Sequence, residues 1–247
     1  MTALWFGLCI MLAWTIEAMS GFGSIVIALS LGALLLPIEA MLPVLVTLNV
    51  LTSGWLMWQH RAHVDRRLLL RTILPGMLPA TLLGIYLRDV LPGPALKVAF
   101  ALLILWFALK ELWAMRRQKA AAAHPVGQTQ LLVAAAGITH GLFASGGPLL
   151  VYALAGRQLG KAAFRATLIS LWLILNGVLC AIFLLQGRIA AHLPEVAGYL
   201  PVVALSVWLG NHLHHRIDEA RFRVLVFRLL ALVGLALLLS QLLVFWR

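Results

Sequence analysis

The chain has 247 residues, of which 63% are hydrophobic and only 11% are charged. Soluble domains contain roughly 25% charged residues, so the composition excludes a soluble enzyme, a DNA-binding module and a disordered tail, and it predicts an integral membrane protein. The formal net charge is +11, but almost all of the 19 Lys and Arg residues lie between apolar runs. There they face lipid head groups rather than nucleic acid.

Eight apolar runs follow one another along the chain. They cover about residues 3–36, 40–58, 72–87, 95–109, 129–156, 162–186, 196–211 and 222–246. Nearly all have the length and composition of helices, and they lack the polar–apolar alternation of a membrane β-barrel. No basic segment precedes the first run, so we expect it to be a membrane segment and not a cleaved signal peptide. The sequence predicts an all-α polytopic membrane protein.

Small residues interrupt two of these runs. The segment SGFGS at 20–24 breaks the first run, and ASGGP at 144–148 breaks the run 129–156. Such breaks leave backbone groups unpaired, which is tolerated at membrane depth only inside protein or beside a water-filled cavity. We therefore expect a broken helix or a helical hairpin at each.

The two halves of the chain repeat one order of features: a broken run, a long helix, a charged loop, a helix with Pro and Gly, and a last helix. Positions correspond by an offset of 123 residues early in each half and of 126 residues later. The offsets match Gly23 with Gly146, Gly54 with Gly177, Pro75 with Pro201 and Gly84 with Gly210. The sequence predicts two homologous repeats, residues 1–118 and 129–247, joined by a cytoplasmic linker at 119–128.

The basic residues indicate how the repeats are oriented. If each broken run crosses the membrane once, the repeats are parallel and the two sides carry 10 and 9 basic residues. If each is a hairpin, the repeats are inverted and the sides carry 15 and four. The positive-inside rule favours the inverted arrangement, with both termini on the outer side of the cell membrane. A hydropathy count then gives about eight spans, and the hairpin arms bring the number of membrane segments to as many as ten.

The breaks are candidate anion sites. A helix N-terminus carries roughly half a positive charge and free N–H donors, and glycine lets a ligand approach the backbone closely. We expect Ser24 to cap the helix after the first break, and Pro148 suits the first turn of the helix after the second. Two such ends could bind an anion near the midplane, as in transporters with inverted repeats; alternatively, the glycines only let helices pack closely. The candidate residues are Ser20, Gly21, Gly23, Ser24, Ser145, Gly146 and Gly147.

Polar residues in the second helix of each half extend this set. Asn49, Thr52, Ser53 and Asn176 could line the site, or they could form hydrogen bonds between helices at about 0.6 kcal/mol each. Arg165 lies near the start of its helix, where it could attract anions from the cytoplasm or extend to the lipid head groups.

Two titratable residues precede the breaks. Glu17 is the only acidic residue deep in an apolar run, and a charge at the bilayer centre costs about 2.5–3.5 kcal/mol on insertion scales. The offset of 123 pairs it with His140. The two could form a proton-coupling pair; alternatively, Glu17 is permanently protonated or lies near an interface, and His140 bonds a backbone carbonyl.

Two loop clusters have simpler explanations. His60 and Asp65 have the spacing of some acyltransferase motifs, but they lie in a short basic loop without a catalytic domain. His212, His214, His215 and Asp218 lack a second cluster that would complete a metal site. No phosphate-binding Gly-Lys-Ser/Thr loop is present, and we expect neither a cofactor nor a catalytic residue.

The duplicated segments EAMSGFGSIVIALSLGALLLP and HGLFASGGPLLVYAL resemble the sulfite exporter TauE/SafE family of membrane transporters, as do HRAHVDRRLLLR and ILPGMLPATLLGIYL. The resemblance covers essentially the whole chain. It implies export or import of small sulfur-containing anions such as sulfite or organosulfonates. We expect a secondary transporter driven by an ion gradient, and Glu17 and His140 make the proton one candidate for the coupling ion. The alternative is a membrane-embedded enzyme or an accessory subunit of a larger membrane complex.

Overall fold

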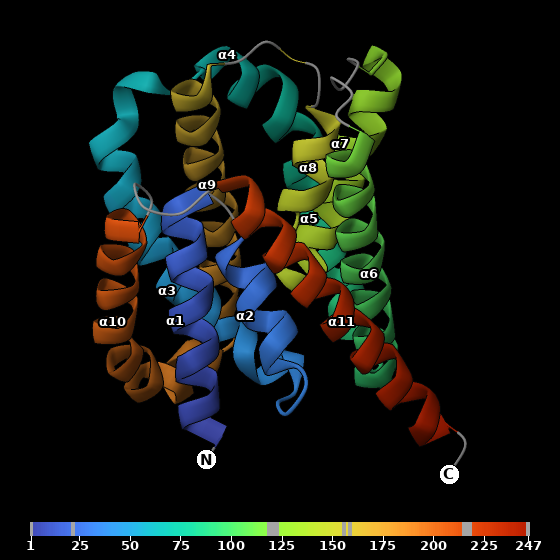
Figure 1. Ribbon diagram of the computed structural model, residues 1–247. Helices are drawn as coiled ribbons and strands as arrows, with labels where there is room; N and C mark the ends of the chain where they lie inside the picture. The colour runs from blue at the N-terminus through green and yellow to red at the C-terminus, as the bar shows by residue number, and fades with distance from the viewer. Residues whose placement is uncertain are drawn as a thin grey trace.

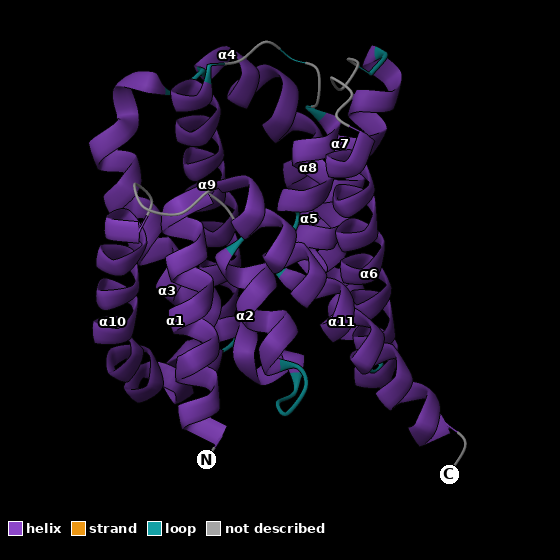
Figure 2. Ribbon diagram, in the orientation of Figure 1, coloured by secondary structure: helices purple, strands orange, loops and turns teal. Residues whose placement is uncertain are grey.

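The computed structural model describes residues 2–20, 23–117, 124–154, 157, 160–213 and 219–245. Within these residues the chain forms helices joined by short connections, with no strand (Figure 2). The helices are α1 (Thr2–Ser20), α2 (Ser24–Gly32), α3 (Ile38–His60), η1 (Arg61–His63), α4 (Arg66–Leu68), η2 (Leu69–Ile73), α5 (Leu74–Val90), α6 (Gly93–Arg117), α7 (Val126–Phe143), α8 (Gly147–Ala153), α9 (Lys161–Leu185), α10 (Arg188–Leu213) and α11 (Glu219–Phe245). The prediction of an all-α protein is confirmed.

Six helical segments of the described chain are long and apolar enough to cross a membrane, three in each half. They are Ile38–His63, Arg66–Val90, Gly93–Arg116, Ala162–Leu185, Arg188–Gly210 and Val224–Gln241. The protein is therefore a multi-pass membrane protein. The larger number of eight to ten segments stays a prediction, because it depends on whether the arms α1, α2, α7 and α8 enter the bilayer.

The helix boundaries follow the offsets found in the sequence. Helices α2 and α3 begin at Ser24 and Ile38, and α8 and α9 begin 123 residues after them. Helix α6 begins at Gly93, and α11 begins 126 residues later. The contacts between the halves show the same correspondence. Helix α1 packs on α10 as α7 packs on α5, and the equivalent pairs α3 with α9 and α6 with α11 also pack together. Two repeats would produce this pattern; their boundaries remain predictions.

The path of the chain is visible in Figure 1. Helix α1 rises from the lower end of the molecule to the first break, and α2 returns toward that end. Helix α7 descends from the upper end to the second break, and α8 returns upward. The start of α1 and the end of α11 both lie at the lower end, whereas α4 lies at the upper end. Two hairpins that enter from opposite ends support the inverted arrangement, which stays a prediction.

Local sequence explains the change of helix type within the span Arg66–Val90. The Asp65 carboxylate accepts a hydrogen bond of 2.9 Å from the backbone N–H of Leu68 and so caps α4. A π-helical stretch, η2, follows and ends just before Pro75. Proline has no N–H to donate to the preceding turn, and a π-bulge is one way in which a helix accommodates such a lost bond.

Helices α5 and α7 pack at backbone contact because glycines face each other between them. A Cβ added at Gly84 would collide with the carbonyl oxygen of Ile138 and the Cα of Gly141. A Cβ at Gly137 would likewise meet the carbonyl oxygen of Met77. Small residues at such an interface are the usual means of close helix packing in membranes.

This contact gives a stability prediction. Gly84→Ala should destabilise the protein by about 1–3 kcal/mol, because the added methyl group meets backbone atoms that cannot turn aside. The matched control is Gly177→Ala in α9, where a Cβ would have nothing within 4 Å. Thermal unfolding in detergent would measure both. Equal melting temperatures for the two variants would contradict the close packing.

Candidate functional site

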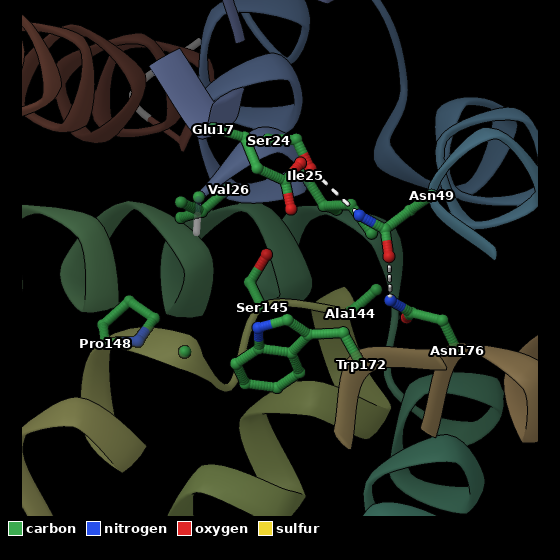
Figure 3. Close-up of a pocket in the computed structure, with 12 residues that line it drawn as sticks. Glu17, Ser24, Ile25, Val26, Asn49, Ala144, Ser145, Pro148, Trp172 and Asn176 are labelled. Atoms are coloured by element: carbon green, nitrogen blue, oxygen red, sulfur yellow. Dashed lines mark hydrogen bonds between the residues drawn. The ribbon is translucent and has the colours of Figure 1, made fainter. Parts of the chain in front are cut away.

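The two breaks meet at one small cavity (Figure 3). Its volume is about 30 Å³, which is room for roughly two water molecules. It lies between the two halves of the chain, with residues from α1, α2, α3, the second break, α8 and α9 in its wall. The lining residues are Glu17, Gly23, Ser24, Ile25, Val26, Asn49, Ala144, Ser145, Gly147, Pro148, Trp172 and Asn176.

Helix α2 points its N-terminus at this cavity. Gly23 is its N-cap, with φ of 104°, a left-handed conformation that favours glycine. The N–H groups of Ser24, Ile25 and Val26 have no acceptor within the helix, since the first intrahelical bond runs from Ile27 N–H to the Gly23 carbonyl at 3.0 Å. All three of these residues line the cavity.

The prediction that Ser24 caps α2 is wrong. Ser24 is the first residue inside the helix, and no side chain caps the N-terminus. Its hydroxyl oxygen instead accepts a hydrogen bond of 3.1 Å from Asn49 Nδ2 on α3. The glycine before it takes the N-cap position, because the chain needs a left-handed residue there to reverse direction.

The second break reverses the chain differently. Ala144 has a left-handed conformation with φ of 51°, and the Ser145 hydroxyl donates to the Phe143 carbonyl at 2.9 Å. Pro148 lies in the first turn of α8, as predicted. Gly146 does not line the cavity; a Cβ there would meet the carbonyl oxygen of Ala136 and the side chain of His140. Its lack of a side chain serves packing.

A buried polar network connects α2, α3 and α9 beside the cavity. Asn49 Oδ1 accepts hydrogen bonds from Asn176 Nδ2 at 2.7 Å and from Ser53 Oγ at 3.1 Å. Asn49, Ser53 and Asn176 are each at most 3% exposed. Asn49 and Asn176 therefore both line the cavity and bond between helices. Ser53 supports Asn49 from outside the cavity wall.

Glu17 lies at the boundary between this cavity and a second one. The second cavity, of about 10 Å³, is lined by Trp14, Glu17, Ala18, Thr52, Leu56, Arg165 and Val207. Glu17 is 8% exposed, and its Oε2 atom has no hydrogen-bond partner among the described residues. In Figure 3 its carboxyl group lies next to Ser24, toward the start of α2. One carboxyl group therefore faces two cavities.

Arg165 turns into the protein rather than toward the lipid head groups. Its Nη2 donates to the Ala18 carbonyl at 3.5 Å, and its Nε is buried without a hydrogen-bond partner among the described residues. It shares the second cavity with Glu17. The guanidinium group is thus held beside the Ala18 carbonyl, in the wall of a cavity that Glu17 also lines.

His140 lies outside both cavities. Its ring is fully buried and stacks on Trp172 with 5.6 Å between ring centroids. Neither ring nitrogen has a hydrogen-bond partner among the described residues, so the alternative in which it bonds a backbone carbonyl does not apply here. The Asn176 side chain lies beside the ring. Asn49, which bonds Asn176, lies beside Glu17, so two asparagines lie between the two titratable residues.

Sequence reasoning missed Trp172. Its ring lies in the cavity wall and separates the cavity from His140. The repeat offset of 123 residues pairs it with Asn49, which is the signal that could have found it. Of the remaining candidates, Gly21 lies outside the described residues, and Ser20 closes α1.

The loop clusters have structural roles where they are described. Asp65 caps α4, and the Nδ1 atom of His60 lies 3.2 Å from the Leu56 carbonyl oxygen. His212 stacks on Trp208 with ring centroids 5.8 Å apart. The other three residues of that cluster, His214, His215 and Asp218, lie outside the described residues.

Comparison with known proteins agrees with this architecture. The family model described as "Sulfite exporter TauE/SafE" matches residues 6–237, nearly the whole chain. Neither a curated protein nor a solved structure gave a match. The matched range includes both breaks and all six long helical spans up to Leu237. The chain therefore belongs to the TauE/SafE sulfite exporter family of membrane transporters.

Proposed function

We propose that this protein is a secondary transporter of small sulfur-containing anions, such as sulfite or an organosulfonate, and that the anion binds in the cavity between the two breaks. The observation that carries the proposal is the convergence of both breaks on one cavity, whose wall includes the polar side chains of Glu17, Ser24 and Asn49. The N-terminus of α2 supplies N–H donors and a partial positive charge. The Ser24 hydroxyl adds a donor from the wall, whereas the Asn176 amide nitrogen donates to Asn49 Oδ1 and holds that wall together.

Glu17 sets a condition on binding. A carboxylate and an anion 4 Å apart repel by on the order of 4 kcal/mol at an effective dielectric constant of 20. That repulsion would weaken binding by roughly a thousandfold, since each 1.4 kcal/mol is tenfold. The anion and an ionised Glu17 therefore exclude each other from the start of α2, and the anion binds when Glu17 carries a proton.

This exclusion couples the anion to a proton. When the anion leaves, Glu17 can ionise and face the same N–H groups, and its proton can leave through the second cavity. That cavity is large enough for about one water molecule, and Arg165 at its wall would stabilise the carboxylate. His140 is proposed as the second titratable residue of the coupling pair, and it would act through its charge because its ring has no hydrogen-bond partner among the described residues.

A ligand screen tests the substrate class. The purified protein should gain thermal stability with sulfite, sulfoacetate or thiosulfate and less with acetate, because tetrahedral and pyramidal oxyanions present several acceptors to converging donors. Transport of the best ligand into proteoliposomes should then saturate with concentration. Equal stabilisation by every anion tested would indicate a non-specific effect of ionic strength and would contradict the proposal.

The orientation in the membrane has its own test. If the repeats are inverted, 15 basic residues gather at one end, and the positive-inside rule predicts that this end lies in the cytoplasm and both termini outside. A green fluorescent protein fused after Arg247 should be dark, whereas the same protein inserted in the linker 119–128 should fluoresce. A bright C-terminal fusion would reject the inverted model.

A further inference from the structure

A third cavity, rich in polar side chains, lies at the opposite end of the molecule from α4. Its volume is about 560 Å³, and its wall comes from the start of α3, the end of α5, and the starts of α6 and α10. The start of α1 and the end of α11 also lie toward this end (Figure 1). It shares no lining residue with the central cavity, and α3 contributes to both. The candidate site residues considered so far all lie elsewhere.

Arg88 is the unusual residue of this cavity. Its side chain is only 3% exposed, and its Nη2 atom is buried without a hydrogen-bond partner among the described residues. Buried guanidinium groups normally donate to an acceptor, because an unpaired buried charge destabilises the fold. Arg88 thus lines a polar cavity with donor capacity that the described protein does not use.

A second guanidinium group stands next to it. Arg188 lies at the rim, with 40% of its side chain exposed. The ring of Phe183 lies beneath both groups, 4.7 Å from Arg88 Cζ and 5.9 Å from Arg188 Cζ. A shared aromatic face fixes the position of two like charges that would otherwise move apart.

One carboxylate serves both arginines. Asp89 Oδ1 lies 3.5 Å from Arg88 Nε and 3.6 Å from Arg188 Nη2. Both distances exceed those of good charge-assisted hydrogen bonds, which are about 2.7–2.9 Å. Asp89 therefore keeps the two groups together without using up their donors. The guanidinium groups of Arg88 and Arg188 are planar and keep N–H groups available, and this geometry suits the binding of an oxyanion.

We propose that Arg88 and Arg188 form a second anion site, which binds the oxyanion group of a small anion as it enters or leaves the protein at this end. The proposal rests on the transport function proposed above. In that function, the site would bind the anion briefly at the outer end of the transport path. Glu39 lines the same cavity, and its carboxylate limits affinity. Weak binding suits a transient site, because the anion must dissociate from it quickly.

Equilibrium binding of radiolabelled sulfite tests the site, with purified protein in phosphatidylcholine nanodiscs. The background is Gly23→Val, which is designed to close the central cavity. In it, Arg88→Gln should weaken binding by about tenfold or more, since it removes charged donors to an anion. Glu39→Gln should tighten binding several-fold, a gain that misfolding cannot imitate. The control is Lys97→Gln, which removes one charge from α6 outside the cavity wall, and it should change affinity less than about twofold.

The outcomes separate the two proposals. If Arg88→Gln and Glu39→Gln both bind sulfite with the affinity of the Gly23→Val background, the second anion site is wrong. The central site is then tested separately by the transport assay. If Gly23→Val leaves parental binding and transport unchanged but Arg88→Gln still weakens binding, the central site is wrong and this one holds. Adding phosphatidylglycerol distinguishes a lipid head group: competition that disappears in Arg88→Gln would assign the site to lipid and overturn the proposal.

Discussion

Replacing Gly23 with Val should abolish anion transport while the protein still inserts in the membrane. Gly23 has φ of 104° and begins α2 at the cavity wall. A β-branched residue is strained in this conformation by about 1–2 kcal/mol and would turn the N–H groups of the first turn away from the anion. Uptake of labelled sulfite into proteoliposomes should fall to the level of empty liposomes.

A matched control separates strain from site damage. Gly187, between α9 and α10, also has positive φ, at 73°, and a Cβ there would meet nothing within 4 Å. Gly187→Val should therefore lose comparable stability while the central cavity stays intact. Its transport at saturating anion should stay near the parental rate, although Gly187 precedes Arg188 of the second anion site. Gly147→Val tests the second break, where the added side chain would press on Trp172, 3.5 Å from an added Cβ. Retained transport in both Gly23→Val and Gly147→Val would move the anion site elsewhere.

Glu17→Gln should uncouple anion movement from the proton gradient. Glutamine keeps the shape of the side chain and cannot ionise, so it mimics the protonated state in which the anion binds. Exchange of labelled for unlabelled anion should survive at close to the parental rate. Accumulation of the anion against its gradient, driven by an imposed pH difference, should be lost. Both measurements use the same proteoliposomes, so a failure of insertion would reduce the two together.

His140→Gln tests the proposed partner in the same assay. If His140 belongs to the proton-coupling pair, the variant should resemble Glu17→Gln. If it serves only the stacking on Trp172, protein yield should fall and coupling should stay normal. Should both variants concentrate the anion as well as the parent does, the proton is not the coupling ion, and a sodium gradient or the membrane potential would be tested next.

Some features followed from the sequence because they depend on local chemistry. Apolar runs without alternation can only be helices in a membrane, since every backbone group must be paired. The breaks at 20–24 and 144–148 were located from glycine and proline alone, which interrupt helices wherever they cluster. Pro148 was correctly placed in the first turn of its helix for the same reason. Membership of the TauE/SafE family also follows from sequence.

The cap of α2 shows where local reasoning failed. A serine after a glycine is a good N-cap by composition, yet the hydroxyl of Ser24 accepts from Asn49 on another helix. Two explanations compatible with the sequence, lining the site or bonding between helices, both apply to Asn49 and Asn176. The bond between them joins residues 127 positions apart, and no local pattern specifies such a pairing.

By itself, the sequence determined the helices, the two breaks, the repeat offsets and the family, because these depend on the residue types and their spacing along the chain. Only the tertiary structure decided which of these parts meet. It brought the two breaks to one cavity, placed Glu17 between two cavities, turned Arg165 inward and put Trp172 between the cavity and His140. The physical reason is that contacts between helices depend on how whole helix faces pack, and each packed face contains residues that lie far apart in the chain.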